Sequence, residues 1–224
     1  MTKILAISGR KQSGKDTNCN FLVRNAPELF NTNSIKKYYF ADELKKFCRD
    51  YFDVPEEWLW GTDADKNRLT KIKWNNLPHA ESLKNKYAID FVMAHNSIEY
   101  LDENLNKEFN TFMTVRELLQ QVGTDIFRKM YENIWVNSCL RVIRKENFKY
   151  ALIADMRFPN EADAIKSEGG ILLRLTRKIT DKDIHTSETA LDNYQGFDKI
   201  LDNSQLGIDE SYNEVVKFVK EIGF

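Results

Sequence analysis

The stretch GRKQSGKDT, from Gly9 to Thr17, constrains the fold most because it directly follows the first apolar run of the chain. That run, KILAIS, is typical of a buried parallel strand that ends in a tight turn. Gly9 lets the chain turn, Gly14 lets the backbone approach an anion, and helix signals begin immediately after Lys15. A phosphate-binding loop requires this order of strand, glycine-bounded loop and helix. The alternative is an ordinary strand-to-helix turn.

Asp16 stands where such a loop ordinarily carries a serine or threonine. It is interpreted in three ways. The acid complements the dipole of the following helix, its carboxylate replaces the hydroxyl near a magnesium ion, or Thr17 supplies the hydroxyl one position later. An anion beside a triphosphate is repulsive unless a cation lies between them. We therefore expect Asp16 and Thr17 to belong to a Mg²⁺ shell, with Asp16 acting partly through water.

Strand and helix patterns alternate along most of the chain, which predicts an α/β fold with a mainly parallel sheet covered by helices on both faces. Thr114 and Glu117 predict a helix cap, and Gly123 is expected to interrupt the helix that follows. Further strands are predicted at residues 37–40, 149–155, 171–177 and 198–203. One helix is predicted to begin after Lys15, and others at residues 41–52, 134–145, 157–168 and 208–222.

The region from Gly61 to about Met113 is polar and has no sustained period. Long structureless loops are uncommon in compact domains, so this region is interpreted as an insertion or a functional loop. The segment AIDFVMA within it resembles a strand. We expect one domain over residues 1–224, with an inserted region at about 41–113.

Composition excludes several classes of protein. The chain has 33 basic and 34 acidic residues, so no global field favours nucleic acid or an anionic membrane. The three cysteines, Cys19, Cys48 and Cys139, lack the spacing of a zinc site and are expected to be buried thiols in a reducing compartment. No apolar run reaches the length of a signal peptide or membrane span, so a cytoplasmic protein is expected.

Five motifs in the same order resemble the phage deoxynucleoside monophosphate kinases. They are SGKDT, RELLQQVGTDIF, the tryptophan of NIWVNSCL, ADMRFPNEADAI and HTSE, and they cover both ends of the chain better than its middle. The resemblance implies a P-loop NTPase-like three-layer fold and Mg²⁺-dependent transfer of the terminal phosphoryl group of ATP to a deoxynucleoside 5'-monophosphate. It also implies the host cytoplasm if the chain is phage-encoded, and suggests a homodimer for which this sequence shows no apolar stripe.

The resemblance assigns the donor site to the phosphate-binding loop and to a later arginine. Lys15 would bind the transferring phosphoryl group, a role that suits a transfer which depends on positioning and charge neutralisation. Arg177 opens a polar segment, about 177–195, that matches the lid of nucleotide kinases. His185 belongs to the HTSE motif and has no assigned role. The complete ATP-binding set is Gly9, Lys11, Ser13, Gly14, Lys15, Asp16, Thr17 and Arg177.

The resemblance also assigns an acceptor site. Arg116 would bind the acceptor phosphate through its bidentate fork. Asp155 ends a buried strand, where parallel sheets bind ligands, and Arg157 follows it. Two of these residues have a simpler alternative: a solvated helix arginine for Arg116, and a helix cap for Asp155. Trp135 is the family's acceptor-site aromatic or a core residue. The acceptor set is Lys45, Lys66, Arg116, Gly123, Thr124, Trp135, Asp155, Met156 and Glu161; Lys15, Arg116, Asp155 and Arg157 are the catalytic candidates.

Two other functions remain open from the sequence. The same core could phosphorylate another small acceptor such as dephospho-coenzyme A, or it could serve as a nucleotide-binding switch without an acceptor. A switch protein does not need a second basic pocket. The cluster of Lys45, Arg116, Arg157 and Arg177 therefore favours a kinase.

Overall fold

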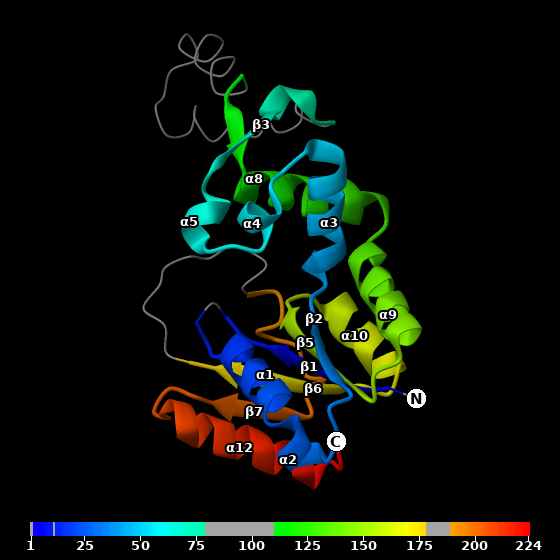
Figure 1. Ribbon diagram of the computed structural model, residues 1–224, viewed down its shortest axis with the longest axis vertical. Helices are drawn as coiled ribbons and strands as arrows, with labels where there is room; N and C mark the ends of the chain where they lie inside the picture. Colours follow the sequence, from blue (N-terminus) through cyan, green and yellow to red (C-terminus); the bar gives the residue numbers. More distant parts are fainter. Residues whose placement is uncertain (1, 11, 79–109, 178–188) are drawn as a thin grey trace. The chain divides into compact units, whose positions relative to one another are not determined.

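The computed structural model of the chain describes residues 2–10, 12–78, 110–177 and 189–224. The described residues form two compact units, Met1–Asp42 with Asn133–Phe224 and Glu43–Glu132. Figure 1 shows the elements of each. None of the described helices combines the length and apolar character that crossing a membrane requires. The segment AIDFVMA and His185 lie outside the described residues.

The first unit is built on a five-stranded parallel sheet with the order β2-β5-β1-β6-β7. The predicted α/β fold with a parallel sheet is confirmed. The second strand begins and ends two residues earlier than predicted. The strands are β1 (Lys3–Ser8), β2 (Ile35–Tyr38), β5 (Tyr150–Met156), β6 (Ile171–Thr176) and β7 (Lys199–Asp202).

Side chains that alternate along the central strands are buried on both faces of the sheet. Leu5 and Ile7 of β1 belong to the core cluster that also contains Leu22 and Phe218, which come from two helices. On the opposite face, α10 contacts β1 and β6. Figure 1 shows α1, α2 and α12 grouped together beside the sheet. The helices are α1 (Lys15–Arg24), α2 (Ala26–Phe30), α9 (Ile134–Glu146), α10 (Pro159–Ser167) and α12 (Ile208–Glu221).

Local signals set the ends of several helices. Helix α1 ends at Arg24, shortly before Pro27 in the first turn of α2. Gly169, with a φ of 72°, follows the end of α10, as the sequence predicts. The cysteines Cys19, Cys48 and Cys139 are free and buried, which confirms their interpretation as thiols.

The second unit contains short helices and a two-stranded antiparallel sheet. Its core includes Leu44, Leu59, Met113 and Leu118, all nearly or fully buried. The polar region from Gly61 to about Met113, which shows no hydrophobic periodicity, therefore contains short helices and strands in the part that the structure describes. They are α4 (Glu56–Leu59), α5 (Asp63–Lys66), β3 (Leu69–Lys73), η1 (Trp74–Asn76), β4 (Phe112–Thr114), α8 (Val115–Gln120) and the π-helix η2 (Gln121–Arg128); α3 (Ala41–Phe52) begins in the first unit and continues into this one.

The predicted interruption at Gly123 is wrong, because the backbone continues from α8 into η2 without a break. A side chain at this position would not fit. A Cβ atom on Gly123 would lie 2.5 Å from Cδ2 of Leu44, which is itself buried. The glycine thus permits close packing of η2 on α3 rather than a turn. The predicted cap is confirmed: Thr114 and Glu117 form a capping box at the start of α8.

Candidate active site

The loop between β1 and α1 turns tightly through two residues with positive φ angles. Gln12 and Gly14 have φ angles of 62° and 96°, and the Ser13 amide donates to the carbonyl of Arg10 at 3.2 Å. Gly9 is required for a different reason, because a Cβ there would lie 2.3 Å from Oγ of Ser13 and 2.5 Å from the carbonyl oxygen of Leu175. The loop opens the ten-residue helix α1, whose N-terminus carries partial positive charge.

The ammonium group of Lys15 is held at this loop. Its Nζ donates to the carbonyl oxygens of Gly9 at 2.5 Å and of Arg10 at 2.7 Å, and the residue is 8% exposed. A buried cation is costly unless it is paired or hydrogen-bonded. The loop carbonyls therefore hold a positive charge at the place where the sequence predicts the phosphates.

Asp16 is exposed and contacts two side chains from β2 and the residue after it. Its Oδ1 accepts a hydrogen bond from the Tyr39 hydroxyl at 2.6 Å and lies 3.4 Å from Nζ of Lys37. Burial and the hydrogen bond to Asp16 raise the pKa of Tyr39 above its usual value. The lysine also donates to Asn20 at 2.6 Å. The protein therefore supplies a cation beside Asp16.

The oxygens of Asp16 and Thr17 suit a hard cation. Thr17 is exposed and lines a pocket next to the loop. The described residues contain no group of three or more histidine, cysteine or carboxylate side chains placed to hold a metal. Mg²⁺ commonly uses one or two protein oxygens together with waters and substrate phosphates, so such a group is not required.

A pocket of about 180 Å³ adjoins the loop. The sequence analysis assigned some of its lining, Ser13, Gly14, Thr17 and Arg177, to ATP. It missed the side of the pocket formed after β7 and at the start of α12. The lining residues are Gln12, Ser13, Gly14, Thr17, Asn18, Arg177, Asn203, Leu206, Gly207, Ile208, Ser211 and Tyr212.

Two buried asparagines connect this pocket to the loop backbone. Nδ2 of Asn203 donates to the carbonyl of Ser13 at 3.1 Å, and Nδ2 of Asn18 donates to that of Gly14 at 3.0 Å and to Oγ of Ser211 at 3.1 Å. These bonds fix which amide atom is nitrogen. Oγ of Ser13 and both Oδ1 atoms are buried and have no partner among the described atoms. The pocket thus offers polar groups that a ligand can satisfy.

The sequence signal for Asn203 was present but unused. It directly follows β7, at the carboxyl edge of a parallel sheet, where such folds bind ligands. Ser211 and Tyr212 give no local signal, because only the packing of α12 brings them to the loop. The ring of Tyr212 stacks on that of Phe21 with centroids 3.9 Å apart.

A second group of candidates lies at the end of β5. The Asp155 carboxylate accepts hydrogen bonds from the amides of Phe40 at 2.8 Å and Ala41 at 3.1 Å. It therefore caps α3, not the helix that follows it in sequence. Burial, and next the negative charge of Glu161, raise the pKa of Asp155 to about 7.

Glu161 is 1% exposed, and its Oε2 accepts from the amides of Arg157 at 2.7 Å and Phe158 at 3.1 Å. Met156 is fully buried, and Trp135, on α9, is 6% exposed. Their burial agrees with core positions. Their assignment to the acceptor remains a prediction, as does that of Arg157.

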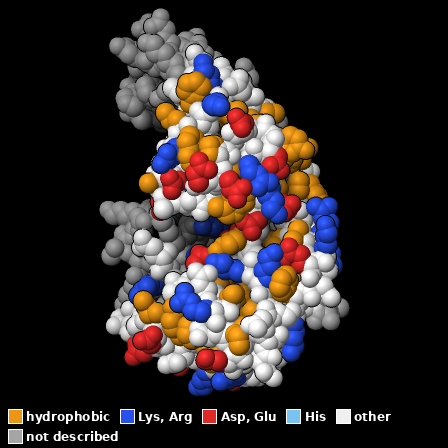
Figure 2. All heavy atoms as spheres, viewed as in Figure 1, with side chains coloured by type: hydrophobic (Ala, Val, Ile, Leu, Met, Phe, Trp, Pro, Cys, Tyr) orange, Lys and Arg blue, Asp and Glu red, His pale blue; other side chains and the backbone are white. Residues whose placement is uncertain are grey.

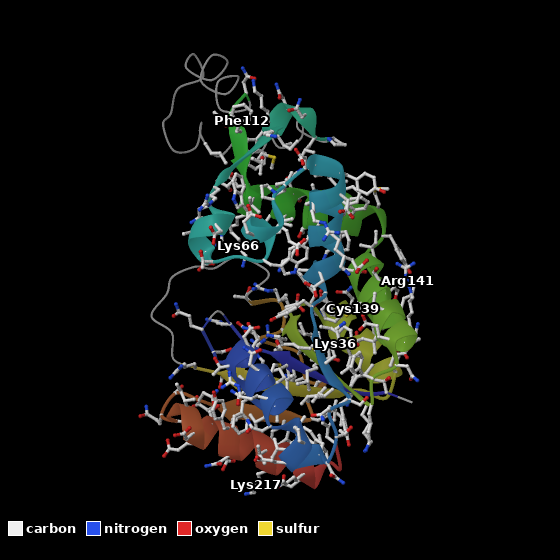
Figure 3. The ribbon with its side chains drawn as sticks, in the orientation of Figure 1. Lys36, Lys66, Phe112, Cys139, Arg141 and Lys217 are labelled. Atoms are coloured by element: carbon white, nitrogen blue, oxygen red, sulfur yellow. The ribbon has the colours of Figure 1, made fainter. Side chains whose placement is uncertain are left out.

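The second unit carries the remaining basic candidates. Arg116 on α8 pairs with Asp63 of α5 at 2.9 Å and also donates to Asn67 at 3.3 Å. Helix α5 contacts α8 and ends at Lys66, which Figure 3 labels. Arg116 and Lys66 therefore belong to two packed helices.

The other acceptor candidates of the second unit lie in different surroundings. Nζ of Lys45 lies 5.4 Å from the ring centre of Trp60. Thr124 is exposed on η2, whereas Gly123 is buried against Leu44. The sequence analysis missed Gln121, a 3% exposed residue of the π-helix whose Nε2 has no partner among the described atoms. Lys11, assigned to ATP, lies outside the described residues.

The model of one protein family, described as deoxynucleotide monophosphate kinase, matches residues 3–215. A bacteriophage T5 protein, deoxynucleoside-5'-monophosphate kinase, is 26% identical over 85% of this chain and 86% of its own length. The deoxynucleotide monophosphate kinase of phage T4 is 26% identical over 97% of this chain and 99% of its own length. A protein of Acanthamoeba polyphaga mimivirus, provisionally named for the same kinase activity, is 27% identical over 96% of this chain and 95% of its own length.

Proposed function

The chain belongs to the deoxynucleotide monophosphate kinase family, and on this premise we propose that it transfers the terminal phosphoryl group of ATP to a deoxynucleoside 5'-monophosphate. The observation that supports this most directly is the glycine-bounded loop with the Lys15 ammonium held across it. Phosphoryl transfer needs little covalent help and depends on positioning and charge neutralisation. A fixed lysine at the N-terminus of a helix supplies both.

We propose that the loop binds the donor phosphates and that the adjoining pocket binds the nucleoside part of ATP. On binding phosphate, the Lys15 ammonium would exchange loop carbonyls for phosphate oxygens. The Oδ1 atoms of Asn18 and Asn203 would accept hydrogen bonds from hydroxyl or amino groups of the nucleoside part of ATP, and the Ser13 hydroxyl would donate to a phosphate oxygen. Arg177 lines the same pocket and would add a positive charge.

Mg²⁺ would be held by Asp16 and Thr17, partly through water, and would neutralise charge on the donor phosphates. Tyr39 and Lys37 would orient the carboxylate of Asp16 for this role. Thr17 is an exposed residue that lines the adjoining pocket.

The acceptor would be bound by the residues that the family resemblance assigns to it. Asp155 and Glu161 would hold the deoxynucleoside, while Arg157 and Arg116 would contact phosphate oxygens, for which the guanidinium fork is suited. Met156, Trp135, Gly123, Thr124, Lys45 and Lys66 complete the proposed acceptor set. The inserted acceptor region, the lid and a homodimer remain part of the proposal.

A coupled ATP assay with each deoxynucleoside monophosphate, the ribonucleotides and dephospho-coenzyme A tests this function. We expect transfer to at least one deoxynucleotide and none to dephospho-coenzyme A. Transfer to dephospho-coenzyme A alone would support the other kinase, and ATP binding without any transfer would support a switch protein. The family match favours neither alternative.

The variant Lys15→Ala tests the role of the loop. We expect kcat to fall by at least about 10²-fold, because charge stabilisation of the migrating group is lost. The control is Lys3→Ala, since Lys3 also donates to a backbone carbonyl, that of Gly223, and lies at the other end of β1. Wild-type turnover in a folded Lys15→Ala protein would contradict the assignment.

A further inference from the structure

One carboxylate beside the phosphate-binding loop is shared by two arginines. Oδ2 of Asp192 accepts from Nη2 of Arg10 at 2.5 Å, and its Oδ1 accepts from Nη2 of Arg174 at 2.5 Å. Charged hydrogen bonds of this kind are roughly twice as strong as neutral ones. Asp192 therefore joins two guanidinium groups that come from distant parts of the sequence.

The two arginines differ in how firmly the fold holds them. Arg174 lies on β6 opposite Ser8 of β1, is 7% exposed, and donates to Oγ of Ser8 at 2.8 Å. The Arg10 side chain is 51% exposed and directly follows Gly9 in the loop. Its carbonyl accepts from Lys15 and from the Ser13 amide. Asp192 thus connects an exposed loop arginine to a buried, fixed one.

The charge balance explains why this link persists. A buried guanidinium that loses its carboxylate partner is strongly destabilising, so Arg174 retains Asp192. Arg10 is the accessible arginine of the two, and its flexible side chain would otherwise lose conformational entropy on binding a ligand.

We propose that Asp192 is a positioning residue for the donor, which holds the guanidinium of Arg10 beside the phosphate-binding loop so that Arg10 contacts the ATP phosphates. The proposal rests on the proposed function only in taking ATP as a ligand of the loop. It requires no acceptor and no transfer. Arg10 is then a binding residue, and Asp192 acts through it.

Calorimetry without acceptor tests the proposal with two probes, ATP and inorganic triphosphate. In Asp192→Asn, which keeps the shape but loses the charge, we expect the Kd of both probes to rise about three- to tenfold. In Arg10→Ala we expect about a tenfold rise. The double variant should resemble Arg10→Ala alone, because Asp192 acts through Arg10. Asp192→Glu should recover part of the affinity.

A matched control separates positioning from general stability. Arg144 and Glu168 form another pair at 2.5 Å, and the Glu168 side chain is 31% exposed, as is that of Asp192. Glu168→Gln removes the charge of an equally exposed carboxylate from this other arginine pair and should leave the Kd of both probes unchanged. Melting temperatures recorded for both variants separate a loss of stability from a loss of affinity. In turnover, Asp192→Asn should raise the KM for ATP and leave that for the acceptor unchanged.

Unchanged or tighter binding in a folded Asp192→Asn protein would overturn the proposal, and tighter binding would identify Asp192 as a competitor of phosphate. Additive effects in the double variant would also overturn it. Failure of the kinase proposal is recognised separately, as absence of transfer with the calorimetric changes intact.

Discussion

The acid next to the loop lysine has a defined environment at the residue scale. Asp16 receives a hydrogen bond from Tyr39 and lies near Lys37, so the negative charge is oriented before any ligand binds. A simple helix-dipole residue needs no such partners, and its contribution would be only about 0.3–1 kcal/mol. These contacts favour the proposed role near magnesium.

We predict that Asp16→Ala raises the Mg²⁺ concentration for half-maximal activity about tenfold, because one ligand or its water contact is lost. Tyr39→Phe should give a smaller rise in the same direction, since Lys37 remains beside the carboxylate. Magnesium titrations of initial rate measure both effects. Glu28→Ala, at an acidic first-turn position of α2, is the control. Full magnesium-dependent activity in Asp16→Ala would show that the acid only complements the helix.

At the scale of elements, the π-helix η2 depends on a glycine that touches α3. Replacing a helical glycine by alanine ordinarily stabilises a helix by about 1 kcal/mol. In Gly123→Ala, the new methyl group would instead meet Leu44 at 2.5 Å. We predict a loss of about 1–2 kcal/mol in the free energy of unfolding, measured with urea.

The effect of Gly123→Ala on the free energy of unfolding should change sign when Leu44 is also replaced. With Leu44→Ala already present, the clash is gone and Gly123→Ala should become stabilising. A stabilising effect in the wild-type background would mean that η2 does not pack closely on α3.

The cap of α3 by Asp155 predicts a dependence of stability on pH. The folded pKa of about 7 lies above the ordinary value of 3.8, so between these values the folded state binds more protons than the unfolded state. Stability attributable to this group should therefore be greatest below about pH 4, fall as pH rises to about 7, and stay constant above that.

Asp155→Asn cannot titrate and should lack this fall. We predict a difference between wild type and variant of about 1–3 kcal/mol between pH 4 and pH 8. Urea unfolding of both proteins across that pH range measures this difference in unfolding free energy. Contributions from groups that titrate in both proteins cancel when the two curves are subtracted. Parallel pH curves would show that Asp155 titrates in the folded state as it does when unfolded.

At the scale of the whole molecule, signals that are local in sequence predicted the sheet and the loop. Buried strands such as β1 and β5 are continuous apolar runs, and the spacing of Gly9, Gly14 and Lys15 is contained in one turn. The second unit was not predicted in detail, because short elements such as α5 depend on caps and packing. Asp192 was missed because tertiary contacts bring it to the loop, whereas Asn203 lies at the end of a predicted strand and could have been found from the sequence.

The distribution of charged side chains on the surface is a second property of the whole molecule that the sequence predicts. Figure 2 shows acidic and basic side chains interspersed over the face in view, in agreement with 33 basic and 34 acidic residues in the sequence. Phosphate recognition therefore depends on particular residues at the loop, which composition does not reveal.

The division into two units predicts that the first folds without the second. The core cluster that contains Leu5, Leu152 and Phe218 draws all its members from residues 1–42 and 133–224, as do the five strands. If a flexible linker replaces residues 43–132, we expect cooperative thermal unfolding and ATP binding without phosphoryl transfer. Lys15→Ala in the shortened protein is the control for binding at the loop. Absence of a cooperative transition would show that the second unit is needed for the core.

The strand order has a consequence for synthesis on the ribosome. β1 and β2 are made first, but β5 lies between them in the sheet, so they have no partner in each other. Residues 39–149 must emerge before β5 can join the two strands. Until then the backbone edges of β1 and β2 that face β5 stay unpaired, and a nascent chain of this length is a natural client for chaperones that bind incompletely folded segments.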